Sequence, residues 1–129
     1  MAYSNAKELD IEDELNTYVT DAMRSAGLDF LRLITFASPV DTGRFRSNWN
    51  VGFGSPDTST TGSVNFSATL AKNESEVKLT PLDVSGVIWF SNNLPYAVPL
   101  NNGTSKQAPQ FFVETVARRA EVNINSGTL

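Results

Sequence analysis

A chain of 129 residues, of which 40% are apolar and 19% are charged, has the composition of one folded globular domain. It contains no cysteine and no histidine. Disulfides and thiolate chemistry are therefore excluded, and the commonest general base and metal ligand near neutral pH is missing. This composition counts against an enzyme, and we expect no catalytic residue, no cofactor and no metal.

The formal net charge of -4 is unevenly spread along the chain. Up to Asp29 the chain has seven acidic residues against two basic ones, Lys7 and Arg24, so one end of the molecule is expected to be negative. DNA binding usually needs a basic face, and this balance argues against DNA as a tightly held ligand. No stretch approaches the ~20 apolar residues of a membrane span, and the first residues lack a signal-peptide run, which predicts a soluble, cytosolic protein.

The first predicted element is a long helix from about Asp10 to Ala37, because apolar residues recur there at spacings of three and four. The acidic residues Glu12 to Glu14 are expected in its first turn, at the positive end of the helix dipole. The helix is expected to stop near Ser38, since the following proline disfavours helical dihedral angles in its predecessor. Gly27 is its predicted weak point.

The middle of the chain predicts a turn, a strand, a loop and a second helix. Residues 40–43 are typical of a turn, and apolar residues alternate from Phe45 to Phe53 as in a half-buried strand. Gly54 to Ser63 carries no core-forming residues and is expected to be a mobile loop. Phe66 to Val77 predicts a shorter helix, although Glu76 to Thr80 could equally be a strand.

The last third of the chain predicts a strand, a turn and a final helix. Val84 to Phe90 has the apolar pattern of a central strand, and Asn102-Gly103 can close a hairpin. Helical spacing returns from Pro109, and proline suits the first position of a helix. Residues 123–129 are polar and are expected to fray.

The order helix, strand, helix, strand pair, helix predicts an α+β fold. A long N-terminal helix and a C-terminal helix are expected to pack on a small antiparallel sheet. The chain has no internal repeat and no boundary signal, so residues 1–129 are expected to form a single domain. Trp49 and Trp89 both fall on apolar positions of predicted strands, and each is expected in the core.

Asp41, Thr42 and Gly43 form the sharpest catalytic candidate. Aspartic proteases of the retroviral type carry this tripeptide and build one active site from two copies, whose aspartates share a proton. There a hydrophobic strand leads into the tripeptide, whereas here a helix and Pro39 precede it and Arg44 follows. The preferred interpretation is a turn, in which Asp41 or Thr42 bonds backbone amides and Gly43 supplies an unusual dihedral angle.

Other site chemistry finds little support in the sequence. Glu12, Asp13 and Glu14 are the densest carboxylate group, but consecutive helical positions point in different directions and cannot converge on one ion. The glycines lack the Lys-Ser/Thr sequel of a phosphate loop. Arg118 and Arg119 are expected near the end of the last helix, where they would complement its negative pole.

Three sequence blocks follow one another in a distinctive order. The first is Val40-Asp-Thr-Gly-Arg-Phe-Arg-Ser-Asn-Trp49, the second is Asn92-Asn-Leu-Pro-Tyr-Ala97, and the third is Gly103-Thr-Ser-Lys-Gln-Ala-Pro109. In the order and spacing of these blocks, the chain resembles the tail-completion and neck proteins of tailed bacteriophages, which include the HK97 gp10-like and lambda minor tail protein Z-like proteins. The resemblance runs through nearly the whole chain, although that family often has an acidic residue where this chain has Asn101 and Asn102.

The resemblance implies a non-enzymatic structural protein of the virion, located at the head-tail junction and in the host cytoplasm during assembly. It would be a neck, tail-completion or tail-terminator subunit that forms a ring, expected to be a hexamer, around the DNA channel. Its expected partners are copies of itself, portal, adaptor or head-completion proteins, and tail tube or tail-terminator proteins. DNA would pass through the channel without specific binding, and no membrane is involved.

The blocks also supply expected roles for individual residues. Turn or structural positions are expected at Asp41, Thr42, Gly43, Trp49, Pro95, Tyr96 and Gly103. Subunit contacts are expected at Asn101, Asn102, Thr104, Ser105, Lys106, Gln107, Pro109 and Gln110. The acidic end of the long helix is expected to reach neighbours as well. Two other functions stay open at this point: a dimeric aspartic protease centred on Asp41, and a generic α+β module that binds a peptide or protein.

Overall fold

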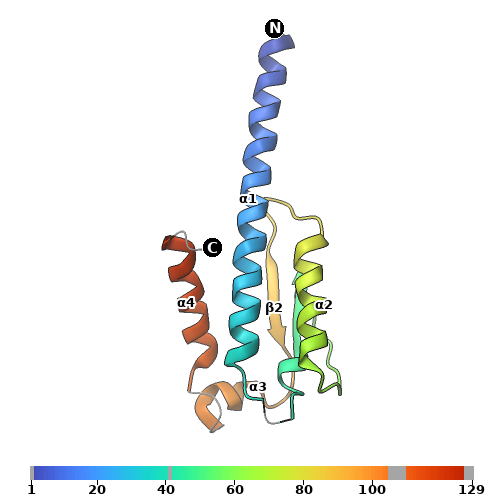
Figure 1. The fold of residues 1–129 in the computed structure, drawn as a ribbon, viewed down its shortest axis with the longest axis vertical. Coiled ribbons are helices and arrows are strands. Elements are labelled where there is room, and N and C mark those ends of the chain that lie inside the picture. Colours follow the sequence, from blue (N-terminus) through green and yellow to red (C-terminus); the bar gives the residue numbers. More distant parts are fainter. Residues whose placement is uncertain (1, 41, 105–109, 127–129) are drawn as a thin grey trace.

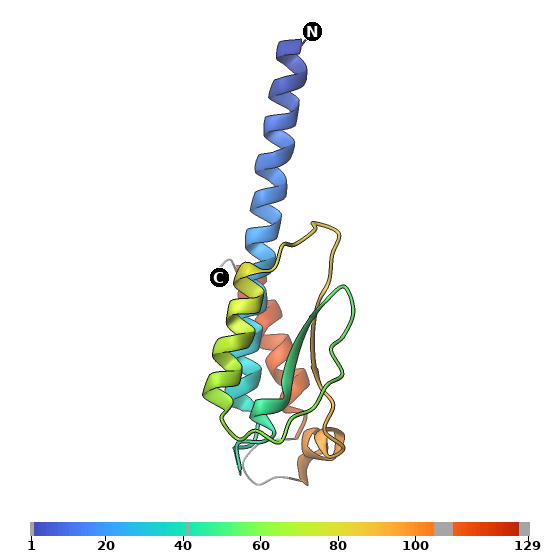
Figure 2. The same cartoon turned by 90° about the vertical axis from the view of Figure 1, so that its right-hand side faces the viewer.

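The structure is a computed structural model that describes residues 2–40, 42–104 and 110–126, with side chains described between residues 11 and 120 outside those gaps. Its main elements are α1 (Ala2–Ala37), β1 (Trp49–Phe53), α2 (Phe66–Leu79), β2 (Ile88–Asn92), α3 (Ala97–Pro99) and α4 (Phe112–Ser126). α1 runs between α2 and α4, and the strands lie against one face of this helical layer (Figure 1, Figure 2). The mixed α+β fold with a small antiparallel sheet is confirmed.

α1 is longer than the sequence predicted, because it begins at Ala2 rather than near Asp10. Glu12 to Glu14 thus lie in the helix interior, and the expectation that they occupy the first turn is wrong. The helix ends at Ala37 as predicted, two residues before a proline. Its first part projects beyond the ends of α2 and α4 (Figure 1, Figure 2), and we call residues 2–22 the stalk. None of the helices within the described residues combines the length and the apolar composition that a membrane span needs.

Two buried clusters form the core between the helices and the sheet. The larger one lies at the end of the molecule away from the stalk and joins α1, α4 and the chain on either side of the sheet; its members are Ile34, Phe45, Trp49, Leu94, Phe112 and Val116. The smaller one joins α1, α2 and β1 through Leu31, Val51 and Val77. α1 therefore contributes to both clusters with its second half only.

Gly27 is buried in α1 where α2 and β2 approach the helix. A Cβ atom at this position would lie 3.5 Å from atoms of Val77, Ile88 and Phe90, which is an ordinary van der Waals separation. The position therefore has room for a methyl group.

Gly27→Ala is expected to raise the free energy of unfolding by about 1 kcal/mol, because glycine is that much less favourable than alanine in a helix interior. Urea denaturation followed by circular dichroism measures the change. Gly27→Leu is the matched control, since it would overpack the same site and is expected to cost about 1–3 kcal/mol. A destabilising Gly27→Ala would contradict the separation seen here.

The sheet has two antiparallel strands, with Trp49 paired to Asn92 and Phe53 to Ile88. The predicted first strand is too long, because residues 45–48 turn away and include a 3-10 helix. β2 begins later than predicted and has β1 as its single strand neighbour among the described residues, so it is not a central strand. Trp49 is buried as expected, whereas Trp89 is 42% exposed and the prediction of a core position for it is wrong.

The segment after β1 has fixed partners where the sequence predicted a mobile loop. The side-chain amide of Asn48 donates to the carbonyl of Thr61 at 3.0 Å and accepts from its backbone N–H at 2.8 Å. The amide of Asn50 donates to the carbonyls of Asp57 and Ser59 at 3.1 and 2.7 Å. The hydroxyl and backbone N–H of Ser59 hold the pKa of the Asp57 carboxyl below its usual value. The Asp57 carbonyl also accepts from the Ser91 hydroxyl of β2 at 2.7 Å, so these bonds hold the loop against both strands of the sheet.

The last third of the chain departs furthest from expectation. Asn102-Gly103 closes no hairpin, because both residues lie in a π-type turn over Leu100–Thr104, where Gly103 has φ of 98°. α4 begins at Phe112 after a residue with positive φ, Phe111, so the predicted start at Pro109, which lies outside the described residues, is wrong. The helix continues to Ser126, so residues 123–126 are helical rather than frayed. Between α2 and α4 the described chain forms one strand, β2, where a pair of strands was predicted.

Candidate functional site

The first two sequence blocks meet the start of α4 around one aromatic side chain, Phe45. Its ring lies 6.0 Å from that of Trp49, 6.1 Å from Tyr96 and 6.2 Å from Phe112, measured between centroids. The side-chain amide of Asn92 donates to the Phe45 carbonyl at 2.9 Å. Segments separated by about half of the chain are thus parts of one packed unit, at the end of the molecule opposite the stalk.

The chain around Gly43 forms a turn that leads into the 3-10 helix. Gly43 has φ of 82°, its N–H donates to the Val40 carbonyl at 3.0 Å, and its own carbonyl accepts from Ser47 N–H at 3.0 Å and Ser47 hydroxyl at 2.8 Å. The Thr42 hydroxyl accepts from the Arg44 N–H at 3.3 Å. Asp41 lies outside the described residues. The geometry on either side of it is that of a structural turn.

Arg46, from the same block, closes the end of α1. Its guanidinium donates to the carbonyls of Ser38 and Phe36, each at 3.0 Å, and lies over the rings of Phe36 and Phe66. Partial burial lowers the pKa of Arg46 from its ordinary value, although an arginine stays charged at any working pH. Arg46, one of the few basic residues, therefore makes its contacts within the fold.

Asn101 binds the start of α4 rather than projecting outward. Its amide donates to the two carboxylate oxygens of Glu114 at 3.0 and 2.9 Å, and its side-chain oxygen accepts from the Val113 N–H at 3.0 Å. Its backbone carbonyl accepts from the Phe111 N–H at 2.6 Å. Asn101 therefore caps the start of α4, and its expected role as a subunit contact stays a prediction.

The rest of the expected contact segment is polar and exposed where it is described. Asn102, Thr104 and Gln110 are exposed, and the Thr104 hydroxyl donates to the Pro99 carbonyl at 3.0 Å. Four further expected contact residues lie outside the described residues: Ser105, Lys106, Gln107 and Pro109. Pro95 and Tyr96 are both exposed at the rim of the larger core cluster.

The charged candidates are dispersed. No group of three or more acidic residues with metal-binding geometry occurs within the described part of the chain. Arg118 and Arg119 lie exposed in the middle of α4, so the prediction that they complement its negative pole is wrong. Nothing among the described side chains resembles an assembled catalytic group.

Large apolar side chains exposed to solvent are the most unusual feature of the surface. One set lies on the stalk, a second around β2 and the segment before it, and a third at α3 and the residue before α4. In that order the sets are Ile11, Leu15 and Tyr18; Val84, Val87 and Trp89; and Tyr96, Val98 and Phe111. Sequence reasoning placed Leu15 and Tyr18 on one apolar face of the long helix and expected Trp89 in the core, because periodicity marks an apolar face without saying what covers it.

An apolar groove lies between α1, β2 and α4. It has a volume of about 480 Å³, and its lining includes Met23, Phe30, Ile88, Phe90, Ala117 and Ala120. Sequence reasoning missed it, since it is made where three elements meet.

The fold and these surfaces define a small α+β protein whose unusual feature is its exposed apolar surface. No protein-family model, no curated protein and no solved structure matches the chain.

Proposed function

We propose that the protein is a structural subunit of the head-tail junction of a tailed phage, which assembles with copies of itself into a ring around the DNA channel. The observation that carries the assembly part is the exposure of large apolar side chains around β2 and at α3. Soluble monomers rarely leave so much of this surface open, and such patches mark contacts with other proteins.

The location at the head-tail junction is supported by the resemblance of the three sequence blocks. The first two of them pack with α4 on Phe45, so they belong to one structural unit. The third block is described only through Thr104, where the turn at Gly103 leads toward α4.

The open side of the sheet supports a ring. Within the described residues β2 has a strand neighbour on one side only, and a two-stranded sheet is marginal by itself, so β2 offers an edge to a neighbouring subunit. A contact between two different surfaces of the same chain propagates head to tail and closes into a ring when the rotation allows. The net charge of -4 suits a channel through which DNA slides, since the wall does not grip phosphates.

The test is the mass of the purified protein in solution, by light scattering and native mass spectrometry, alone and mixed with portal-side proteins. We expect a closed oligomer. Trp89→Ser and Val87→Ser, which remove exposed apolar area beside the open edge of β2, are expected to raise the concentration needed for assembly about tenfold, the effect of 1.4 kcal/mol.

Thermal unfolding of the same variants is the control, and it should stay close to the wild type, because both side chains are more than two-fifths exposed. A protein that remains a strict monomer and joins no virion fraction would overturn the proposal. So would assembly that is indifferent to both substitutions and to every other exposed apolar position.

A further inference from the structure

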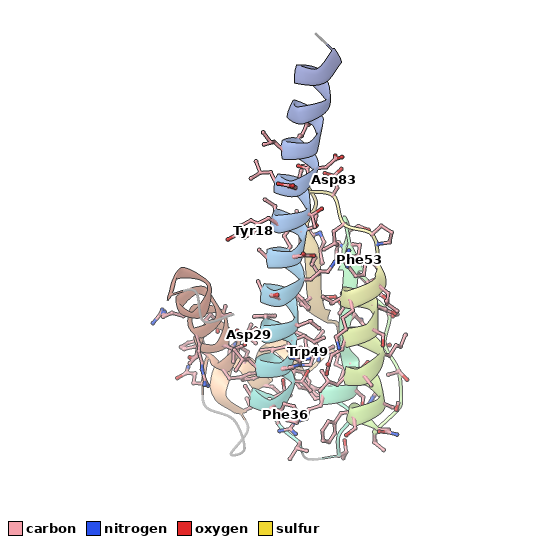
Figure 3. All side chains as sticks on the ribbon, turned by 45° about the horizontal axis from the view of Figure 1, so that its top comes forward. Tyr18, Asp29, Phe36, Trp49, Phe53 and Asp83 are labelled. Carbon is pink, nitrogen blue, oxygen red and sulfur yellow. The ribbon has the colours of Figure 1, made fainter. Side chains whose placement is uncertain are left out.

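The stalk carries an apolar stripe that no described part of the chain covers. Ile11, Leu15 and Tyr18 are 56, 62 and 73% exposed, and with the exposed Ala22 they are spaced by four, three and four residues. This spacing places them on one face of a helix. Tyr18 points outward from α1 on the side where α4 lies further down (Figure 3).

The stripe continues the surface that α4 covers lower on the same helix. Leu15 precedes Leu33 by about five helical turns, so both face the same way, and Leu33 packs against the cluster that α4 completes. α4 meets α1 through Phe112, Val116 and Ala120, which are spaced by four residues. The stalk therefore has a second surface on which a helix can pack, in line with α4 and beyond its end.

The charges around the stripe are all of one sign. From Ile11 to Ala22 the charged residues are Glu12, Asp13, Glu14 and Asp21, with no lysine or arginine. All four carboxylates are exposed. An occupant of this face therefore needs apolar residues at helical spacing and a basic rim.

That requirement separates the possible occupants. The stalk of a second copy would bring four more carboxylates against these four, and like charges on facing helices destabilise a pair. An anionic membrane surface and DNA are repelled for the same reason. A basic amphipathic helix of another protein meets both the apolar and the electrostatic requirement.

We infer that the stalk is the docking site for a basic amphipathic helix of a partner protein, which packs along Ile11, Leu15, Tyr18 and Ala22. Its lysine or arginine residues would lie beside the carboxylates that flank the stripe, Glu12 on one side and Glu14 and Asp21 on the other. This inference rests on the proposed function, in which the stalk reaches a neighbouring protein of the junction. The partner helix needs about three turns to cover the stripe, or roughly 16 Å of helix.

The test uses three designed 18-residue peptides as probes, with binding measured by fluorescence anisotropy. One carries leucine at heptad core positions with lysine beside them, the second carries glutamate in place of lysine, and the third has the composition of the first in scrambled order. We expect binding of the lysine peptide alone, weakened at high salt as a charge-dependent contact should be. Equal binding of the glutamate or scrambled peptide would overturn the inference.

Variants locate the contact. Leu15→Ser with Tyr18→Ser is expected to weaken binding at least tenfold. Glu12→Gln with Glu14→Gln and Asp21→Asn, which removes the carboxylates that flank the stripe, is expected to weaken it severalfold and to reduce its salt dependence. Asp13→Asn alone, on the opposite face of the helix, is expected to change it little. Leu79→Ser is the matched control, because Leu79 is 79% exposed on α2 and lies away from the stripe. The same loss in the control variant, or none in the stalk variants, contradicts the inference.

Sedimentation of the same proteins without peptide separates this inference from the proposed function. If the wild type dimerises and Leu15→Ser with Tyr18→Ser is monomeric, a second copy occupies the stripe and the inference is wrong. If the protein forms a ring but does not bind the lysine peptide, the inference is wrong and the proposed ring still stands. A monomeric protein that binds the peptide overturns the ring and leaves the docking site.

Discussion

Phe45→Ala is expected to lower the free energy of unfolding by about 3–5 kcal/mol, the usual cost of removing a buried aromatic ring. Phe45 is 5% exposed and lies in contact with the rings of Trp49, Tyr96 and Phe112. Its removal leaves a cavity at the point where the segment before β1, the segment after β2 and α4 meet. Since domains of this size are stable by only about 5–15 kcal/mol, the loss takes a large share of the total. Urea denaturation monitored by tryptophan fluorescence measures it.

Phe45→Leu is the matched control, because it keeps an apolar side chain in the same space and is expected to cost less than about 1.5 kcal/mol. If Phe45→Ala cost less than Phe45→Leu, or less than about 1 kcal/mol, the first two blocks and α4 would not share a core. The structural support for the resemblance would then disappear with it.

The helices were the most predictable part of the fold, because their apolar periodicity is long and their ends carry physical signals. α1 ends before Pro39, and α2 begins after Asn65, whose side-chain oxygen accepts from the Ala68 N–H as an N-cap. The start of α1 was misplaced because residues 2–10 mix apolar and polar residues without a strong helical periodicity, yet contain no proline or glycine that would break a helix.

The strands were harder to predict, because short alternation does not specify a strand. Phe45 and Ser47 alternate with polar residues, but hydrogen bonds from Ser47 and Asn48 to the carbonyls of Gly43 and Arg44 hold a turn there instead. The burial of Trp89 depends on whether the second face of the sheet is covered, and a covering layer is a property of the whole fold.

The candidate surfaces were even harder to predict from the sequence than the strands. Leu15 and Tyr18 have the spacing of a core face, and only the position of α4 along α1 decides that they stay uncovered. Nothing in the local sequence of Asn101 indicates that Glu114 and the Val113 N–H are its partners within the chain. Polar residues in loops show their partners only once the chain is folded.

Gly43→Ala is expected to lower the free energy of unfolding by about 3 kcal/mol, from two causes that a second glycine can separate. Gly43 has φ of 82°, a region that costs an ordinary L-residue about 1–2 kcal/mol. In addition, a Cβ atom there would lie 2.4 Å from the carbonyl oxygen of Val64, so the turn and the chain entering α2 would have to move apart.

Gly54→Ala supplies the control, because Gly54 has φ of 81° but no atom within 4 Å of the added Cβ. Gly54→Ala introduces the dihedral-angle strain without a clash, and it is expected to lower the free energy of unfolding by about 1 kcal/mol. The difference between the two variants, measured in the same urea titration, is the cost of the clash with Val64. Equal losses would mean that Gly43 is required for its dihedral angle only. A harmless Gly43→Ala would contradict the turn itself and reopen a chemical role for Asp41 and its neighbours.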